Sequence, residues 1–302
     1  MKTAVAGQRI AVENVLFATD FSTCSDAALP YAASIARRFG ATLHAVHVMP
    51  TFADAFFASG ERKSVEAEKE HTQIEAYLEG LENQLEDTSP KIRTPRGKIS
   101  DALTKVIEED KIDLLVLGTH GRSGVRKLIT GSIAEEIFRR VACPVLSIGP
   151  NVSSHPKDEI EFHKILFATD FSENSLSALP YAISLAEENQ ADLLLLHVVE
   201  QPAAGVVDGF SASLLSHLRA LVPPEAEPWC RSQCLLEFGE LFAPPSSRIL
   251  EIAADREADL IVLGVHPAYG KLGVVTHLAS NTAKIVTEAA CPVLTVGGRC
   301  AK

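Results

Sequence analysis

The chain of 302 residues contains one pattern twice, and this internal repeat limits its fold more than any other feature. The motif Leu-Phe-Ala-Thr-Asp-Phe-Ser ends at Ser22 and again at Ser172, at an interval of 150 residues. Ala-Leu-Pro-Tyr-Ala recurs at 28–32 and 178–182, and Cys-Pro-Val-Leu recurs at 143–146 and 291–294. Repetition at this distance predicts two domains of one kind, residues 1–152 and 153–302. The segment from Pro150 to Glu161, with its prolines and serines, suits a linker.

Within each repeat, β-type runs alternate with helical patterns. In the first repeat we predict strands at 15–18, 42–49, 92–95, 114–117 and 143–149, and helices at 25–39, within 51–90, at 100–109 and after 131. The helix within 51–90 is amphipathic, with Ile74, Leu78, Leu81 and Leu85 on one face. Such alternation predicts an α/β fold in which each repeat is a doubly wound, mainly parallel sheet with right-handed crossovers.

A glycine-rich loop follows the fourth expected strand. The apolar run ends at Gly118, Gly121 follows, and Gly131 and Ser132 stand directly before a helical pattern. Glycines let the backbone approach phosphate oxygens, and a helix N-terminus supplies N–H groups and a positive dipole end. The cations Arg122, Arg126 and Lys127 lie in the loop between. The alternative is a plain turn, because glycine is common after α/β strands; neither the P-loop nor the dinucleotide pattern is present.

Asp20 and two histidines have competing interpretations. Asp20 follows the first strand, where it could cap the next helix or face a ligand at the carboxyl edge of the sheet. For His47 we favour a structural role, whereas a structural and a ligand-facing role remain open for His120. Ser100 is the expected N-cap of the helix at 100–109.

The second repeat departs from the first at the glycine loop. Pro267 stands in place of Gly121 and Ala279 in place of Gly131, while Ser280 keeps the serine; Lys271 is the one full cation. Proline lacks an N–H and alanine carries a Cβ, so the phosphate cradle is intact in the first repeat and damaged in the second.

Charge and cysteine content exclude several functions. A formal net charge of −11 disfavours a nucleic-acid or membrane surface, and the six cysteines show no Cys-x-x-Cys pairing for a zinc site. No apolar run is long enough to span a bilayer, and residues 1–13 lack the apolar core of a secretory signal. We therefore expect a cytoplasmic protein that binds neither nucleic acid nor membrane.

With these residues in view, the chain resembles a tandem universal stress protein, with two UspA-type domains in one polypeptide. The most specific feature is Gly-x2-Gly-x9-Gly-Ser, formed by Gly118, Gly121, Gly131 and Ser132, which is the pattern of the ATP-binding branch. The resemblance implies two Rossmann-like, five-stranded parallel sheets of order 3-2-1-4-5, with the nucleotide between strands one and four. It also implies that the domains meet through their fifth strands, 144–148 and 292–296, as an intramolecular pseudo-dimer that could pair again into a homodimer.

The resemblance also implies a set of nucleotide-binding residues in the first repeat. Ala18 and Thr19 would contact the nucleoside, Asp20 the ribose and a Mg²⁺ ion, and the backbone of Val48 the adenine. Gly118, His120, Gly121 and Arg122 would border the ribose and phosphates, and Gly131, Ser132 and Ile133 would hold the phosphates.

The leading hypothesis is an ATP-binding stress protein in which nucleotide in the first domain regulates assembly or a partner interaction. The sequence offers no activated nucleophile, Walker lysine or paired carboxylates, so catalysis would be at most slow Mg²⁺-dependent ATP hydrolysis. A scaffold that binds no nucleotide is the third possibility.

Overall fold

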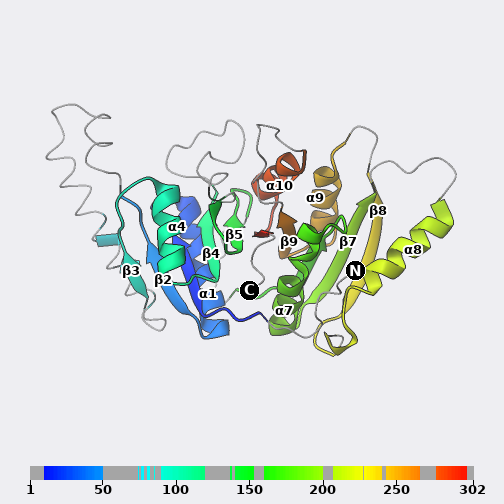
Figure 1. The fold of residues 1–302 in the computed structure, drawn as a ribbon, viewed down its shortest axis with the longest axis horizontal. Helices are drawn as coiled ribbons and strands as arrows, with labels where there is room; N and C mark the ends of the chain where they lie inside the picture. The colour runs from blue at the N-terminus through cyan, green and yellow to red at the C-terminus, as the bar shows by residue number, and fades with distance from the viewer. Residues whose placement is uncertain are drawn as a thin grey trace.

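The computed structural model describes residues 10–49, 90–119, 140–152, 160–199, 207–226, 228–239, 243–265 and 277–297, with single residues 74, 76, 77, 80, 81, 85 and 137. Its centre is one sheet of ten strands in the order β3-β2-β1-β4-β5-β10-β9-β6-β7-β8 (Figure 1). The N-terminal repeat contributes β1 (Asn14–Ala18), β2 (Thr42–Val46), β3 (Lys91–Arg93), β4 (Leu114–Gly118) and β5 (Val145–Ile148). The C-terminal repeat contributes β6 (Lys164–Ala168), β7 (Asp192–Val199), β8 (Ser232–Phe238), β9 (Leu260–Val265) and β10 (Val293–Gly297).

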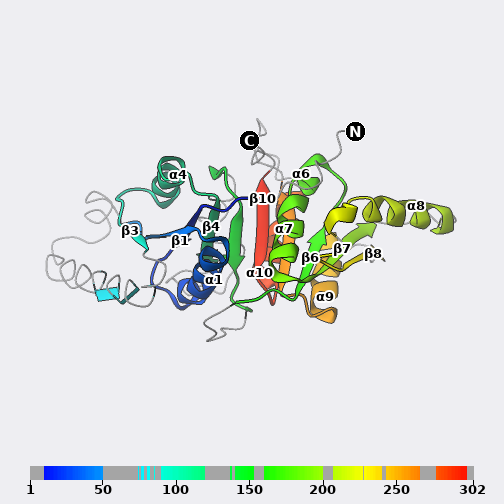
Figure 2. The same cartoon turned by 90° about the horizontal axis from the view of Figure 1, so that it is seen from below.

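Each repeat has the predicted strand order 3-2-1-4-5, and every pairing within a repeat is parallel. The pairing of β5 with β10 is antiparallel and joins the two sheets edge to edge (Figure 2). The predicted meeting of the fifth strands is therefore confirmed. Pro144 directly precedes β5, and β10 pairs with the outer side of β5, so β5 is not an edge strand.

The helices cover the two faces of the sheet in different ways. They are α1 (Thr23–Phe39), α4 (Ile99–Glu109), α6 (Glu173–Leu176), α7 (Leu179–Asn189), α8 (Val207–Arg219), α9 (Pro245–Asp255) and α10 (His277–Glu288), with a 3₁₀ turn at Pro224–Ala226. On one face, apolar residues of α1, α7 and α8 share one continuous core that runs across both repeats. On the other face, α4 covers one cluster, and α9 and α10 cover a separate one. Because helices lie on both faces, inner strands such as β4 and β9 are apolar along almost their whole length.

Local signals explain where the helices begin and end. Gly40 ends α1 in the left-handed conformation at φ 64°, as its sequence position predicts. The N-cap of α1 is Ser22, whose hydroxyl accepts the N–H of Ser25 at 3.2 Å, so the interpretation of Asp20 as the cap is wrong. Ser100 is not the cap of α4 either. Lys98 holds that position without a side-chain cap, because α4 begins earlier, at Ile99.

The same Ala-Leu-Pro-Tyr-Ala motif gives one helix in the first repeat and two in the second. Pro30 lies inside the continuous α1, whereas Pro180 lies in the first turn of α7, after the short α6. Ser177 lies between α6 and α7, and its hydroxyl donates to the carbonyl of Asn174 at 2.6 Å. A serine that bonds its own backbone competes with the helical ladder, which favours the break at this point.

The predicted amphipathic helix of the first repeat is supported by the residues the structure describes there. Ile74, Leu81 and Leu85 are buried, with Leu81 and Leu85 in the core that α1 also covers. Leu78 lies outside the described residues.

Reciprocal contacts lock the two repeats together around the β5–β10 pair. The N–H of Ile10 donates to the hydroxyl of Ser184 on α7 at 3.0 Å, and the N–H of Ile160 donates to the hydroxyl of Ser34 on α1 at 3.2 Å. Because Ile10 and Ile160 each precede the first strand of their own repeat, each repeat sends a short arm onto the other's helix. The guanidinium of Arg38 adds a hydrogen bond to the carbonyl of Glu188 at 3.0 Å.

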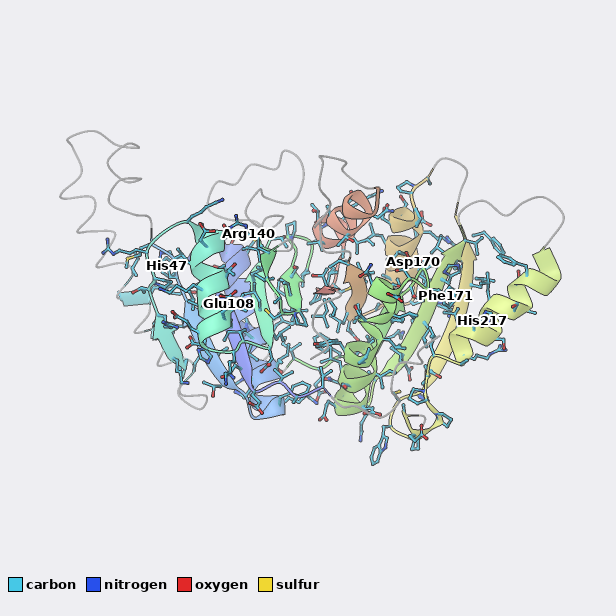
Figure 3. The ribbon with its side chains drawn as sticks, in the orientation of Figure 1. His47, Glu108, Arg140, Asp170, Phe171 and His217 are labelled. Carbon is cyan, nitrogen blue, oxygen red and sulfur yellow. The ribbon has the colours of Figure 1, made fainter. Side chains whose placement is uncertain are left out.

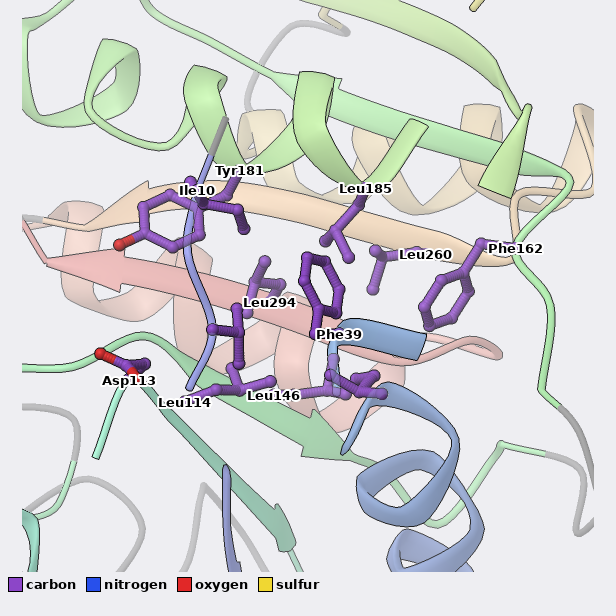
Figure 4. A pocket seen from close by; sticks show the side chains of 12 residues that line it. Ile10, Phe39, Asp113, Leu114, Leu146, Phe162, Tyr181, Leu185, Leu260 and Leu294 are labelled. Atoms are coloured by element: carbon purple, nitrogen blue, oxygen red, sulfur yellow. The ribbon is translucent and has the colours of Figure 1, made fainter. Parts of the chain in front are cut away.

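A small apolar cavity lies at this junction (Figure 4). Side chains of both repeats line it, among them Ile10, Phe39, Leu146, Phe162 and Leu294. Its volume of about 20 Å³ leaves room for little more than one water molecule. A cavity of this size is too small for a nucleotide.

Gly118 and Gly264 are required for close packing of the helices against β4 and β9. A Cβ on Gly118 would lie 2.5 Å from the carbonyl carbon of Cys24, and one on Gly264 would lie 2.0 Å from the carbonyl oxygen of Asn174. Both contacts are with the backbone of the helical segment that follows the first strand of the same repeat, and backbone atoms cannot rotate away. The first glycine of the loop pattern therefore has a packing role in both repeats, independent of any ligand.

We expect Gly264→Ala to lower the free energy of unfolding by about 1–3 kcal/mol through this overpacking. Gly209→Ala is the control, because Gly209 lies in α8 with no heavy atom within 4 Å of a new Cβ. That change should stabilise the helix by about 0.5–1 kcal/mol. Urea unfolding followed by circular dichroism measures both; equal stabilities would contradict the packing role.

His44 is a buried titratable group in β2. Its side chain is 1% exposed; Nε2 lies 3.1 Å from Oδ1 of Asn14, and Nδ1 lies 3.4 Å from Oδ2 of Asp110. Burial lowers the pKa of His44 below its usual value, and Lys91 and Arg93 on β3 act in the same direction, while Asp110 opposes them. Leu194 occupies the matching register position in the C-terminal repeat.

A histidine whose pKa is lower in the folded state than in the unfolded chain destabilises the fold in acid, because the unfolded chain then binds the proton more readily. We expect the free energy of unfolding to fall as pH drops below about 6.5, the unperturbed value for histidine. In His44→Leu this part of the pH dependence should disappear. Urea unfolding at several pH values between neutral and mildly acidic checks this, and parallel curves for the two proteins would refute it.

Candidate functional site

The candidate site is the crevice at the carboxyl ends of β1 and β4 in the N-terminal repeat. The helix after β1 packs on one face of the sheet, whereas Ile137, on the helical segment after β4, packs in the cluster on the other face. The chain therefore leaves adjacent strands in opposite directions, and such a switch point is where open α/β sheets bind ligands.

The turn from Thr19 to Ser22 directly follows β1 at this switch point. The Thr19 hydroxyl accepts the N–H of Phe21 at 3.0 Å and lies 3.0 Å from the hydroxyl of Ser25. The Asp20 carboxylate accepts the N–H of Ser22 at 3.0 Å. Asp20 is thus held by its own turn at the carboxyl edge of β1. Asp20 therefore lies at the switch point, where open α/β sheets bind ligands, and its contact with a ligand stays a prediction.

Phe21 has a left-handed backbone, with φ of 61°, which is rare for an aromatic residue. Such a conformation costs on the order of 1–3 kcal/mol and persists where surrounding contacts enforce it. Its ring stacks on His47, with centroids 4.1 Å apart, and contacts Tyr77 at 4.4 Å. The Tyr77 hydroxyl in turn donates to Asp26 on α1 at 2.6 Å. The turn is therefore held between β2, α1 and the amphipathic segment.

His47, the residue after β2, contacts the turn that follows β1. Its Nδ1 lies 2.9 Å from the carbonyl oxygen of Thr19, and its ring lies against Phe21. These contacts support the structural role favoured for His47.

Val48 presents its backbone to the crevice. The N–H of His47 donates to Arg93 at 3.1 Å and the N–H of Met49 to Pro95 at 2.9 Å, so both neighbours bond toward β3. In a parallel sheet alternate residues bond to opposite sides, so the N–H and C=O of Val48 face the β1 side. β1 has already ended at Ala18, and among the described residues no hydrogen bond to these two groups is found. Both groups therefore face the carboxyl edge of β1, where the nucleotide contact of Val48 stays a prediction.

The C-terminal repeat builds the same turn. Phe171 has φ of 63°, Asp170 accepts the N–H of Ser172 at 2.9 Å, and Nδ1 of His197 lies 2.7 Å from the carbonyl of Thr169. Figure 3 shows Asp170, Phe171 and His217 close to one another; the rings of Phe171 and His217 lie 6.5 Å apart, so His217 on α8 takes a place like that of Tyr77. Burial tends to raise the pKa of Asp170, but hydrogen bonds from Ser172 and Ser175 outweigh it and lower that pKa.

The predicted site residues divide into two sets. Ala18, Thr19, Asp20, Val48 and Gly118 are described and lie around the ends of β1, β2 and β4. The phosphate-end residues His120, Gly121, Arg122, Gly131, Ser132 and Ile133 lie outside the described residues. Within the described part of the chain, no three His, Cys, Asp or Glu side chains are grouped to hold a metal ion. The left-handed phenylalanines were not anticipated, because phenylalanine carries no local signal for that conformation.

The described helices also include none that is long and apolar enough to cross a membrane.

Comparison with known proteins agrees with the repeat. The model of the Universal stress protein family matches residues 11–148 and again 161–297. A universal stress protein of Methanocaldococcus jannaschii is 29% identical over 140 residues, covering 45% of this chain and 81% of its own length.

One solved structure has a similar fold over nearly the whole chain. The crystal structure of a universal stress protein from Archaeoglobus fulgidus matches with a TM-score of 0.71 at 20% identity, covering 94% of this chain and 96% of that one. A universal stress protein solved in complex with cAMP is 25% identical and covers 48% of this chain and all of its own length (100%), with a TM-score of 0.36.

The two matched regions coincide with the two halves of the ten-stranded sheet, and together they cover most of the sequence. The chain therefore belongs to the universal stress protein family, with one match to the family in each repeat.

Proposed function

We propose that this is a cytoplasmic ATP-binding protein of the stress response. Nucleotide would occupy the N-terminal domain, residues 1–152, and regulate an assembly or a partner interaction. The observation that carries the proposal is the pair of Val48 backbone groups turned toward the crevice, opposite the fixed Thr19–Ser22 turn.

The two ends of the proposed nucleotide rest on different observations. Val48, Ala18 and Thr19 would contact the adenosine, with Asp20 near the ribose. The phosphates would lie on the Gly131–Ser132 corner, which is assigned from the glycine pattern and the family resemblance. The loop cations, including Arg122, would then provide charge-assisted contacts.

The C-terminal domain, residues 153–302, would bind nucleotide more weakly because of its phosphate end. Its adenosine-side turn matches that of the N-terminal repeat bond for bond, so that side does not distinguish the two. Pro267 and Ala279 replace glycines of the loop. Ala279 and Ser280 also lie within α10, and the next turn of this helix is tied to α9, since Ser246 donates to Asn281 at 2.9 Å and Lys284 donates to Ser247 at 2.8 Å. Those bonds hold the start of α10 against α9 without a ligand.

Titration calorimetry of the full chain with ATP should give one tight site per chain. Gly131→Val should weaken that binding at least tenfold, because a β-branched side chain would stand where phosphate oxygens need backbone N–H groups. Ala279→Val changes the matching position of the other repeat and should leave the tight site unaltered. Two equal sites, or loss of binding in Ala279→Val alone, would refute the assignment, and absence of any binding would favour a scaffold.

Asp20 would hold Mg²⁺ with the nucleotide and support slow hydrolysis. Asp20→Asn keeps the Oδ1 acceptor for Ser22, so the turn should survive. We expect ATP affinity in Mg²⁺ to fall several-fold, with little change in EDTA, because only the metal contact is lost. Asp170→Asn is the matched control and should bind like the unchanged protein. Equal losses in Mg²⁺ and EDTA would assign Asp20 to the turn alone.

A further inference from the structure

The exposed large apolar side chains belong to the α8–β8 region of the C-terminal repeat. Among the described residues, the large hydrophobic side chains that stand exposed are Phe210 at 50%, Trp229 at 53% and Phe238 at 38%. All three belong to residues 207–239, the segment of α8 and β8 at the outer end of the C-terminal repeat (Figure 1). Trp229 lies shortly before β8 and Phe238 is its last residue, so exposed apolar side chains stand near both ends of this strand.

β8 is an edge strand of seven residues, Ser232–Phe238, paired on one side with β7. The N–H of Leu193 donates to the carbonyl of Arg231 at 2.8 Å, and the N–H of Gly239 donates to Val199 at 3.0 Å. Odd-numbered residues of β8 therefore bond to β7. By the alternation of a parallel ladder, Ser232, Cys234, Leu236 and Phe238 turn their N–H and C=O groups outward.

The opposite edge of the same sheet is built differently. β3 has three residues, and Lys91 and Arg93 stand at its ends. Short length and positive charge are the usual means by which proteins prevent edge-to-edge pairing. β8 has neither: it is more than twice as long and contains no lysine, arginine, proline or glycine.

We propose that β8 pairs antiparallel with β8 of a second copy of this chain, so that two ten-stranded sheets join edge to edge. The strand is complementary to itself when Leu235 lies opposite Leu235 of the second chain. Cys234 then pairs with Leu236, and Ser232 pairs with Phe238. In all four residues the backbone N–H and C=O groups point away from β7. Each of these pairs exchanges both backbone hydrogen bonds, as hydrogen-bonded pairs of an antiparallel ladder do.

Side chains in this register are compatible on both faces. Glu237, which is ion-paired to Arg248 on α9 at 2.7 Å, comes opposite Gln233, so no like charges meet. On the other face Cys234 and Leu236 meet their partners as an apolar patch, and Phe238 lies beside it. A strand of another sequence would not in general match these cross-strand pairs. A second copy of β8 therefore fits this edge better than an arbitrary strand.

The chain already uses this mode of assembly internally. The β5–β10 junction is an antiparallel pairing of fifth strands around Leu146 and Leu294, with helices of both repeats packed on one face. β8 would extend the same arrangement to a second chain at the outer end of the sheet. This proposal concerns the surface of the C-terminal repeat and does not depend on nucleotide binding.

Sedimentation equilibrium at physiological salt tests the proposal on the full chain. The unchanged protein should dimerise with concentration. Ser232→Lys with Phe238→Lys places lysines directly opposite each other in the dimer, and should raise the dissociation constant at least tenfold, since like charges facing across a strand pair are destabilising. Both residues are exposed, so the fold should be kept.

The matched control is Ser232→Glu with Phe238→Lys, which places opposite charges in the same positions and should keep the dimer. The double-lysine variant lowers the net negative charge of the chain, so its failure to pair cannot come from overall repulsion. Amide exchange gives a second readout: the outward N–H groups of Cys234 and Leu236 should exchange more slowly as the protein concentration rises, whereas that of Leu235 should not change. A monomer at all concentrations, or a dimer equally stable in both double variants, would overturn the proposal.

Discussion

The antiparallel pairing of β5 with β10 is the constraint on which the rest of the structure depends. It converts two five-stranded sheets into one and places α1 and α7 side by side on a single continuous core. Ser34 and Ser184 each hold the arm of the other repeat, so neither repeat completes its packing alone. Because β5 and β10 pair with each other, the edges of the sheet among the described strands are β3 and β8, which differ in length and charge.

The second constraint is the turn that follows the first strand of each repeat. Thr19, Asp20 and Ser22 satisfy the backbone of their own turn, and the histidine of the next strand fixes the carbonyl of Thr19. These local bonds hold a phenylalanine in a left-handed conformation that it would not adopt alone. The same bonds recur in the C-terminal repeat. The proposed difference in nucleotide binding between the repeats therefore rests on the glycine loop, where Pro267 and Ala279 replace glycines.

Much of the fold was predictable because it rests on short-range patterns. The two occurrences of Leu-Phe-Ala-Thr-Asp-Phe-Ser predicted the two domains, and apolar runs predicted the buried strands. The errors were also local. Asp20 and Ser100 are plausible caps by residue type, but the true N-caps are Ser22 and Lys98, because a cap is set by where the first helical turn begins. The sequence pattern placed the first residue of each of these helices with an error of at most about two residues.

The sequence by itself determined the class of fold, the repeat, and which repeat keeps the glycine pattern, since each follows from residue identity and spacing. Tertiary structure decided what depends on residues distant in the chain. It showed that Gly118 and Gly264 leave space for a neighbouring helix, that Val48 turns its backbone to the crevice, and that no described strand pairs with the outer side of β8. Clashes and hydrogen-bond directions are set by which segments pack together, and no local pattern encodes them.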